Sequence, residues 1–129
     1  MAVYGTYHHV HLVSRDPEAA AEWYVKALGA EISSRTESKG AVSVRLKVGD
    51  ANLSVRGVRP EETASEGGDL AIGLHHIGLM VDDIEAAIRQ VVDNGGEMTD
   101  PPHTGTSGNT VAFVRCPENL HIEFLQPKD

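Results

Sequence analysis

The sequence of 129 residues has very little cysteine, since Cys116 is the only one. A single cysteine excludes a disulfide within the chain and is typical of a reducing compartment, so we expect a cytoplasmic protein. A lone cysteine of this kind is usually a small apolar side chain in the core, and we interpret Cys116 in that way.

Long apolar runs and clusters of basic residues are also missing. No apolar stretch approaches the roughly 20 residues of a membrane-spanning helix, and the start, MAVYGTYHHV, lacks the basic and apolar regions of a signal peptide. The net charge is −8, and the 11 Lys and Arg residues do not cluster. We therefore expect no nucleic-acid or membrane partner. With 40% hydrophobic and 23% charged residues, the chain is predicted to form one globular domain, residues 1–129.

The chain contains an internal repeat at an offset of 67 residues. His8-His9 falls on His75-His76, and nine of the 22 positions from 8 to 29 are identical in the second copy. The same offset relates Asn52-Leu53 to Asn119-Leu120. The sequence therefore predicts two copies of one unit: module one at 5–59, a linker at 60–72 and module two at 73–127.

Each copy has the pattern of a β-α-β-β-β unit. Alternating apolar residues predict a first strand, a helix follows with an aspartate cap (Asp16 in the first copy, Asp83 or Asp82 in the second), and glycine ends it. We expect the strands at 7–13, 30–33, 41–48 and 51–58 in the first copy, and at 74–81, 97–99, 110–115 and 120–125 in the second. The fold class is thus α+β, with two tandem modules. Because one helix covers only one face of each sheet, we expect the two open faces to form a half-open barrel around a metal site.

Strand alternation predicts which side chains point into this barrel. It places His9 and His11 on the first strand of copy one, His76 on the matching strand of copy two, and His121 and Glu123 on the last strand. Two histidines and a carboxylate on rigid strands are suitable ligands for Fe, Mn, Ni, Co or Zn, with further positions left open. The simpler alternative for each residue is an ordinary surface or core group.

The other histidines have simpler interpretations. His8 and His75 are expected to be structural or exposed, and His103 to be a loop residue in PPHTGTSGN. Exposed strand edges and an apolar helix face around Trp23 and Tyr24 predict a homodimer. The linker is long enough for the two modules to pair within one chain or between two chains.

Two segments, GLHHIGLMVDDIEAAI and GTSGNTVAFVRCPENLHIEFLQ, resemble the vicinal oxygen chelate superfamily. This superfamily includes glyoxalase I, methylmalonyl-CoA epimerase, extradiol dioxygenases, fosfomycin-resistance enzymes and bleomycin-binding proteins. The resemblance covers essentially the whole chain and is closest to the epimerases and glyoxalase I. It implies that His9, His76 and Glu123 bind one divalent metal. It also implies a small-molecule substrate that chelates the metal through two neighbouring oxygens, in a lyase or isomerase reaction that stabilises an enolate.

One position departs from the closest relatives. Glyoxalases and epimerases take a fourth ligand, Glu or Gln, from the last strand of the first copy, where the offset of 67 places Arg56. Arginine cannot bind a cation, so we expect three protein ligands. Arg56 then either pairs with Glu123 or binds an anionic group of the substrate, and we favour the second role. Glu123 would also act as the base, assisted by His11 or His121.

Two further observations bear on the reaction. Residues 40–49 contain no carboxylate for the second base of an epimerase, and Phe113 stands where an extradiol dioxygenase has a tyrosine. The alternatives to a lyase or isomerase are an Fe(II) or Mn(II) dioxygenase and a non-catalytic binding protein for an antibiotic or metabolite.

Overall fold

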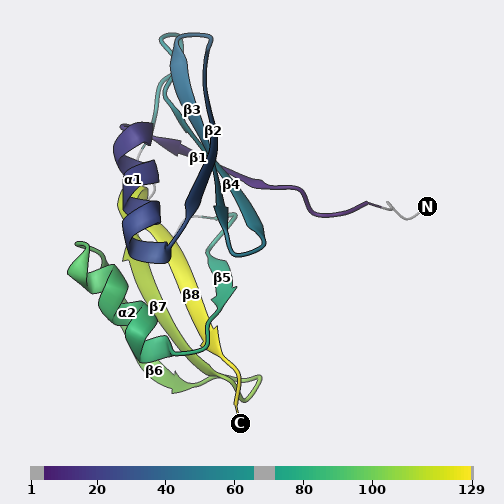
Figure 1. Ribbon diagram of the computed structural model, residues 1–129, viewed down its shortest axis with the longest axis vertical. Helices are drawn as coiled ribbons and strands as arrows, with labels where there is room; N and C mark the ends of the chain where they lie inside the picture. Colours follow the sequence, from purple (N-terminus) through teal and green to yellow (C-terminus); the bar gives the residue numbers. More distant parts are fainter. Residues whose placement is uncertain (1–4, 66–71, 129) are drawn as a thin grey trace. The chain divides into compact units, whose positions relative to one another are not determined.

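The computed structural model of the chain describes residues 5–65 and 72–128. These residues form two tandem β-α-β-β-β modules (Figure 1), so the predicted α+β class is confirmed. The main boundary between the two compact units lies between Thr63 and Ala64, inside the segment predicted to be the linker. None of the helices in the described ranges has the length and apolar character that crossing a membrane requires.

Module one contains one helix and a mixed sheet with the strand order β1-β4-β3-β2. Strand β1 runs parallel to β4, and the other neighbours are antiparallel. The elements are β1 (Val10–Ser14), α1 (Pro17–Leu28), β2 (Glu31–Ser38), β3 (Ala41–Val48) and β4 (Ala51–Gly57).

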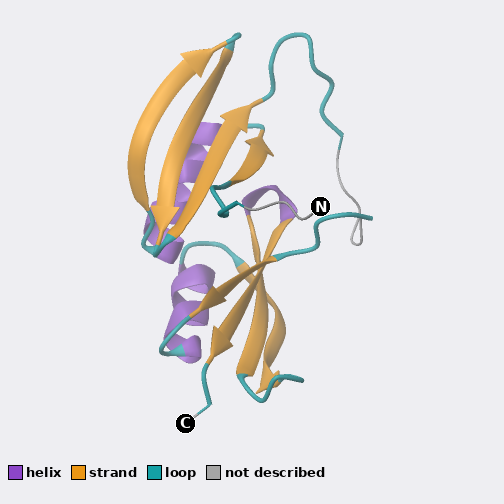
Figure 2. Cartoon of the chain, turned by 90° about the vertical axis from the view of Figure 1, so that its right-hand side faces the viewer, coloured by secondary structure: helices purple, strands orange, loops and turns teal. Residues whose placement is uncertain are grey.

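Module two repeats this topology, with the strand order β5-β8-β7-β6 and the parallel pair β5 and β8. In each module the helix covers one face of its own sheet (Figure 2). The elements are β5 (Ile77–Met80), α2 (Ile84–Asp93), β6 (Glu97–Thr104), β7 (Thr110–Cys116), a 3-10 turn η1 (Pro117–Asn119) and β8 (Leu120–Gln126).

Both helices begin at the predicted aspartates. The Asp16 carboxylate accepts a hydrogen bond from the backbone N–H of Ala19, and Asp83 does the same for Ala86. Each bond satisfies an N–H that the first turn of a helix leaves without a partner. Helix α1 ends at Gly29, whose φ of 68° lies in the left-handed region that glycine adopts without strain.

The core of each module lies between the helix and the sheet. In module one the helix residue Tyr24 (2% exposed) belongs to this core, so it is not available for the dimer contact that the sequence predicted around Trp23 and Tyr24. The spacing of apolar residues along an amphipathic helix is the same whether its apolar face packs in the core or at an interface. In this helix the face with Tyr24 packs in the core. Cys116 is 5% exposed at the end of β7, which confirms its interpretation as a buried apolar side chain.

Several strand limits differ from those predicted. The first strands begin later, at Val10 and Ile77, so the paired histidines precede them. Strands β2 and β6 are longer than expected, and His103 lies in β6 rather than in a loop. Pro101 and Pro102 made this strand hard to predict, because proline has no backbone N–H to donate. Strand β6 lies at the edge of its sheet and has a shifted register, so the missing hydrogen bonds cost little free energy there.

Candidate functional site

Module two brings together two of the predicted metal ligands, His76 and Glu123. Gly78 on β5 lies opposite Glu123 on β8, and it places no side chain over the carboxylate. Nε2 of His76 lies 3.5 Å from Oε1 of Glu123, and both side chains are partly buried, with 33% and 21% of their surfaces exposed. The late start of β5 therefore leaves His76 within reach of the carboxylate.

The distance between these two atoms fits a shared metal ion. Metal–nitrogen and metal–oxygen distances of about 2.0–2.2 Å at a tetrahedral angle give an N···O distance of about 3.4 Å. The 3.5 Å separation of His76 Nε2 and Glu123 Oε1 matches this value without movement of either side chain. When His76 is protonated, the same two groups instead form an ion pair. The donor set is thus suited to a borderline divalent cation.

Aromatic rings surround this pair within module two. Phe113 on β7 lies opposite Glu123, and its ring meets the His76 ring edge-on, with centroids 5.0 Å apart and an interplanar angle of 86°. His121 stacks on His75, with centroids 5.9 Å apart and an angle of 18°. Phe113 therefore limits the positions open to the His76 ring, and it contributes no hydroxyl group.

Module one contains the other two candidate histidines. His9 directly precedes β1, and His11 lies within the strand, with the two ring centroids 6.2 Å apart. Partial burial is the first cause that lowers the pKa of His11, and the positive charge of Arg56 is the second. Both effects favour a neutral imidazole, which can accept a proton.

Arg56 pairs with a residue that sequence reasoning did not single out, Glu62. Nη1 and Nη2 of Arg56 donate to the two carboxylate oxygens of Glu62 at 2.6 and 2.9 Å, in a bidentate arrangement. The backbone N–H of Arg59 donates to the same carboxylate at 2.8 Å. The hydrogen bonds from Arg56 and from the Arg59 backbone lower the pKa of Glu62 to about 2. The Arg56 guanidinium therefore already holds a carboxylate within its own module.

The signal for Glu62 was present in the sequence. The acidic pair Glu61-Glu62 comes directly after the last strand of module one, but acid-rich segments of this kind usually form solvated loops. An arginine at the end of β4 can reach such an acid only if the chain turns back, as it does here in a turn at residues 60–61. Nε of Arg59 is buried and has no hydrogen-bond partner among the described residues.

The strand pairing corrects the correspondence between Arg56 and Glu123. In module one His11 lies opposite Ser54, and in module two Gly78 lies opposite Glu123. Since His11 and Gly78 are 67 residues apart (78 − 11), the residue in the place of Glu123 is Ser54, not Arg56. The connections before β7 and β8 are longer than those in module one. The last strands are therefore related by an offset of 69 (123 − 54) rather than 67.

The described residues bring two of the three predicted ligands together within one module. His76 and Glu123 are adjacent in module two, whereas His9 belongs to module one. Within residues 5–65 and 72–128, the structure contains no group of three or more His, Cys, Asp or Glu side chains arranged to hold a metal. The three-ligand site therefore stays a prediction.

Comparisons with known proteins give a consistent result. A sequence model described as the glyoxalase/bleomycin resistance protein/dioxygenase superfamily matches residues 6–124. The lactoylglutathione lyase of Escherichia coli O157:H7 is 30% identical over 125 residues, which cover 94% of this chain and 92% of that protein. A protein of Synechocystis sp. named "probable lactoylglutathione lyase" is 39% identical over 59 residues, and this match spans less than half of each chain, 45% of both.

A solved structure has the same fold. The glyoxylase/bleomycin resistance protein/dioxygenase domain from Frankia sp. EAN1pec superposes with a TM-score of 0.81, at 17% identity, over 98% of this chain and all of that chain. This likeness supports the two-module α+β architecture.

Proposed function

Because the chain belongs to the glyoxalase/bleomycin resistance protein/dioxygenase superfamily, we propose that it is a divalent-metal-dependent lyase of the glyoxalase I type. The observation that carries the proposal is the 3.5 Å approach of His76 Nε2 to Glu123 Oε1, two groups to which the family resemblance assigns metal binding. The E. coli relative, named lactoylglutathione lyase, favours this reaction over epimerisation and ring cleavage.

The proposed metal site consists of His9, His76 and Glu123. Neutral imidazole and carboxylate suit Fe, Mn, Ni, Co or Zn. A divalent ion held there supplies Lewis-acid polarisation of two neighbouring substrate oxygens. Ser54, in the place that Glu123 occupies in the other module, has no carboxylate, so three protein ligands remain the expectation.

The proposed substrate is a hemithioacetal of glutathione, and the reaction moves a proton between two neighbouring carbon atoms. Glu123 is the proposed base, since a carboxylate that binds the metal would lie beside substrate oxygens bound to the same metal. His11 is suited to assist because its lowered pKa keeps its imidazole neutral near pH 7. His121, whose ring stacks on that of His75, the neighbour of His76, is the second candidate to assist.

Arg56 is the proposed anchor for an anionic group of the substrate. The guanidinium group of Arg56 already binds the Glu62 carboxylate through two hydrogen bonds. The same bidentate geometry is suited to the recognition of a substrate carboxylate. An anionic group of the substrate would either displace the Glu62 carboxylate or bind Arg56 and Arg59 together with it. Binding at this position would therefore be weaker than at an arginine with no internal partner.

We further propose that the enzyme is a cytoplasmic homodimer. Val13 on β1 and Met80 on β5 are 46% and 61% exposed, although both are apolar strand residues. Covering such residues is favourable, and an interface between modules of one or two chains would do so.

The test of the function joins metal analysis to an assay. Protein purified without chelator is expected to carry one equivalent of a divalent metal and to convert the hemithioacetal of methylglyoxal and glutathione. His76→Ala and Glu123→Ala should lose both properties, whereas His103→Ala, a control in β6, should lose neither. Full metal occupancy in His76→Ala or Glu123→Ala would disprove the ligand assignment. Oxygen consumption with catechols would favour a dioxygenase, and ligand binding without metal or turnover would favour a binding protein.

A further inference from the structure

Each module begins with two adjacent histidines whose rings are joined by a hydrogen bond. In module one, Nδ1 of His8 lies 2.7 Å from Nδ1 of His9. In module two, Nδ1 of His75 lies 2.8 Å from Nδ1 of His76. The ring planes are nearly perpendicular in both pairs, at 81° and 85°. Because the same geometry occurs in both modules, it is a built feature of the repeat.

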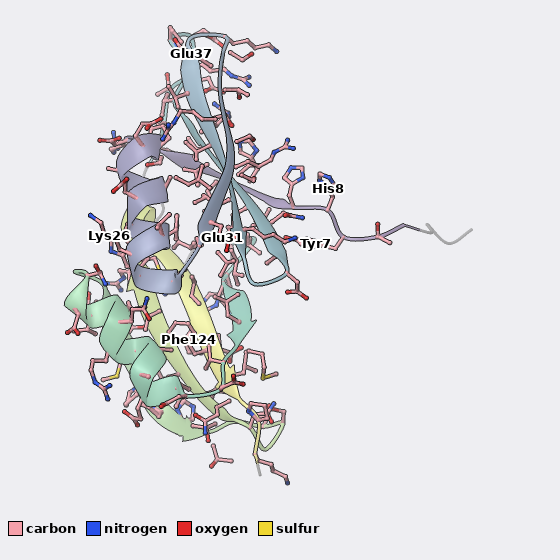
Figure 3. The ribbon with its side chains drawn as sticks, viewed as in Figure 1. Tyr7, His8, Lys26, Glu31, Glu37 and Phe124 are labelled. Atoms are coloured by element: carbon pink, nitrogen blue, oxygen red, sulfur yellow. The ribbon has the colours of Figure 1, made fainter. Side chains whose placement is uncertain are left out.

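The start of each first strand makes this geometry possible. Adjacent residues in a regular strand point to opposite faces of the sheet, so their rings cannot meet. Here β1 begins at Val10 and β5 at Ile77, directly after the histidine pairs. Figure 3 shows His8 on the extended segment that precedes β1. Both rings of a pair can therefore turn toward each other.

In each module, a residue of the last strand contacts the first, or outer, histidine of the pair, which is His8 in module one and His75 in module two. The correspondence of Ser54 with Glu123 also relates Asn52 to His121, two residues earlier on each strand. Asn52 Nδ2 donates a hydrogen bond to the backbone oxygen of His8 at 3.1 Å, and the ring of His121 stacks on that of His75. Equivalent positions thus support His8 and His75 by different contacts.

An Nδ1···Nδ1 hydrogen bond between neutral rings contains one proton. Two N–H groups, or two lone pairs, would repel each other at 2.7–2.8 Å. One ring therefore has its proton on Nδ1 and a free lone pair on Nε2, and the other has the reverse arrangement. Whichever ring donates is the one whose Nε2 can bind a metal.

We infer that His8 and His75 are positioning residues that accept this hydrogen bond and so hold His9 and His76 in the Nδ1–H form. This inference rests on the proposed metal site. In module two the consequence is directional, since Nε2 of His76 is the atom that faces Glu123. Each outer histidine fixes the tautomer and the ring orientation of its neighbour, the role that carboxylates and backbone carbonyls have beside other metal-binding histidines.

The first experiment reads the tautomers directly in metal-free protein. Two-bond ¹H–¹⁵N correlation spectra of the full chain at about pH 8.5 distinguish Nδ1–H from Nε2–H rings, and His76 is expected in the Nδ1–H form. His75→Phe keeps an aromatic ring but removes the acceptor, so His76 should shift toward the Nε2–H form. His75→Asn offers a side-chain oxygen near the place of Nδ1 and should restore the wild-type tautomer. His103→Phe serves as the matched control and should change nothing at His76.

The second experiment measures Zn²⁺ affinity of the same proteins by competition with a chelating dye. His75→Phe is expected to weaken binding about 10- to 100-fold, and His75→Asn to recover most of the loss. A wild-type His76 in the Nε2–H form, or an unchanged Nδ1–H form in His75→Phe, would overturn the inference. An Nδ1–H ring in a protein that binds no metal would uphold the tautomer assignment and reject the proposed function, so the two failures are distinguishable.

Discussion

Ser54 on β4 and Glu123 on β8 occupy the same position in their two modules, each opposite the equivalent residue of the first strand. Glu123 is a candidate ligand at this position, and Ser54 is a buried residue with 3% of its surface exposed. A hydroxyl group is a weaker metal ligand than a carboxylate. The proposed metal site therefore retains an open position where glyoxalases and epimerases have a fourth ligand.

The register makes a specific prediction for substitutions on β4. Ser54→Gln places glutamine, a residue type that glyoxalases and epimerases use as the fourth ligand, at the matching position. The cobalt-substituted variant should therefore show an altered visible spectrum. It should also bind the metal more tightly, by about 10-fold or 1.4 kcal/mol. Since Ser54 is buried, the larger side chain should cost about 1–3 kcal/mol of metal-free stability. Arg56→Gln is the matched comparison, two residues along the strand.

Arg56→Gln should leave the cobalt spectrum as it is in the wild type, because its position lies opposite Val13, two residues beyond the place of the ligand. A new coordination bond in Arg56→Gln but not in Ser54→Gln would contradict the strand register and restore the uniform offset of 67.

The fold was predictable from the sequence because the repeat fixes the element order twice. Helix caps at Asp16 and Asp83, and alternating apolar residues in β8, carry local signals that the structure confirms. The correspondence of Ser54 with Glu123 was not predictable, since a uniform offset ignores loop lengths. Turn lengths shift the pairing of strands without changing the pattern within each strand.

The partners of the site residues were harder to predict than the residues themselves. Glu62 binds Arg56 only because residues 60–61 form a turn that brings the chain back to β4. The hydrogen bond between His75 and His76 depends on the residue at which β5 begins. Strand limits are the least certain part of any sequence-based prediction, and here they decide which rings can meet.

The role of Arg56 can be separated from that of Glu62 by kinetics. If Arg56 binds a substrate anion, Arg56→Gln should lower kcat/KM for anionic substrates about 10-fold or more, mainly through KM. Glu62→Gln removes the internal competitor and should lower KM for the same substrates. Neutral substrate analogues should respond to neither change. Equal effects on anionic and neutral substrates would limit Arg56 to a structural role.

Glu62 should also give the protein a distinct acid sensitivity. Its pKa is lowered from 4.5 to about 2 by the hydrogen bonds from Arg56 and from the backbone of Arg59. A group with a lowered pKa stabilises the fold above pH 4.5, and this contribution is lost as the pH falls toward about 2. Wild type should therefore melt at a higher temperature than Glu62→Gln at pH 5–7.

The difference in melting temperature should shrink as the pH falls from 4.5 to 2, when the wild-type carboxyl becomes protonated. Glu61→Gln changes the neighbouring acid, which makes none of these hydrogen bonds, and should track the wild type closely. A gap between wild type and Glu62→Gln that stays constant over this range would show that the ion pair adds nothing to stability.

Cys116 should be chemically inert in the native protein. Burial raises the pKa of its thiol to about 12, so almost no thiolate exists at pH 8. Reaction with iodoacetamide at pH 8 should be slower than for a free thiol by orders of magnitude, and should accelerate in denaturant. Rapid alkylation without denaturant would mean that β7 opens readily near its end.

The last prediction concerns the assembly. Sedimentation at micromolar concentration should show a species of twice the 13.8 kDa chain mass, because dimerisation offers cover for apolar strand residues such as Met80 (61% exposed). A single 13.8 kDa species would reject the dimer. Mixing His9→Ala with His76→Ala then tests how the modules pair. If ligands from two chains form one site, mixed dimers contain one undamaged site and recover metal binding. If each chain builds its own site, both sites stay damaged and nothing is recovered.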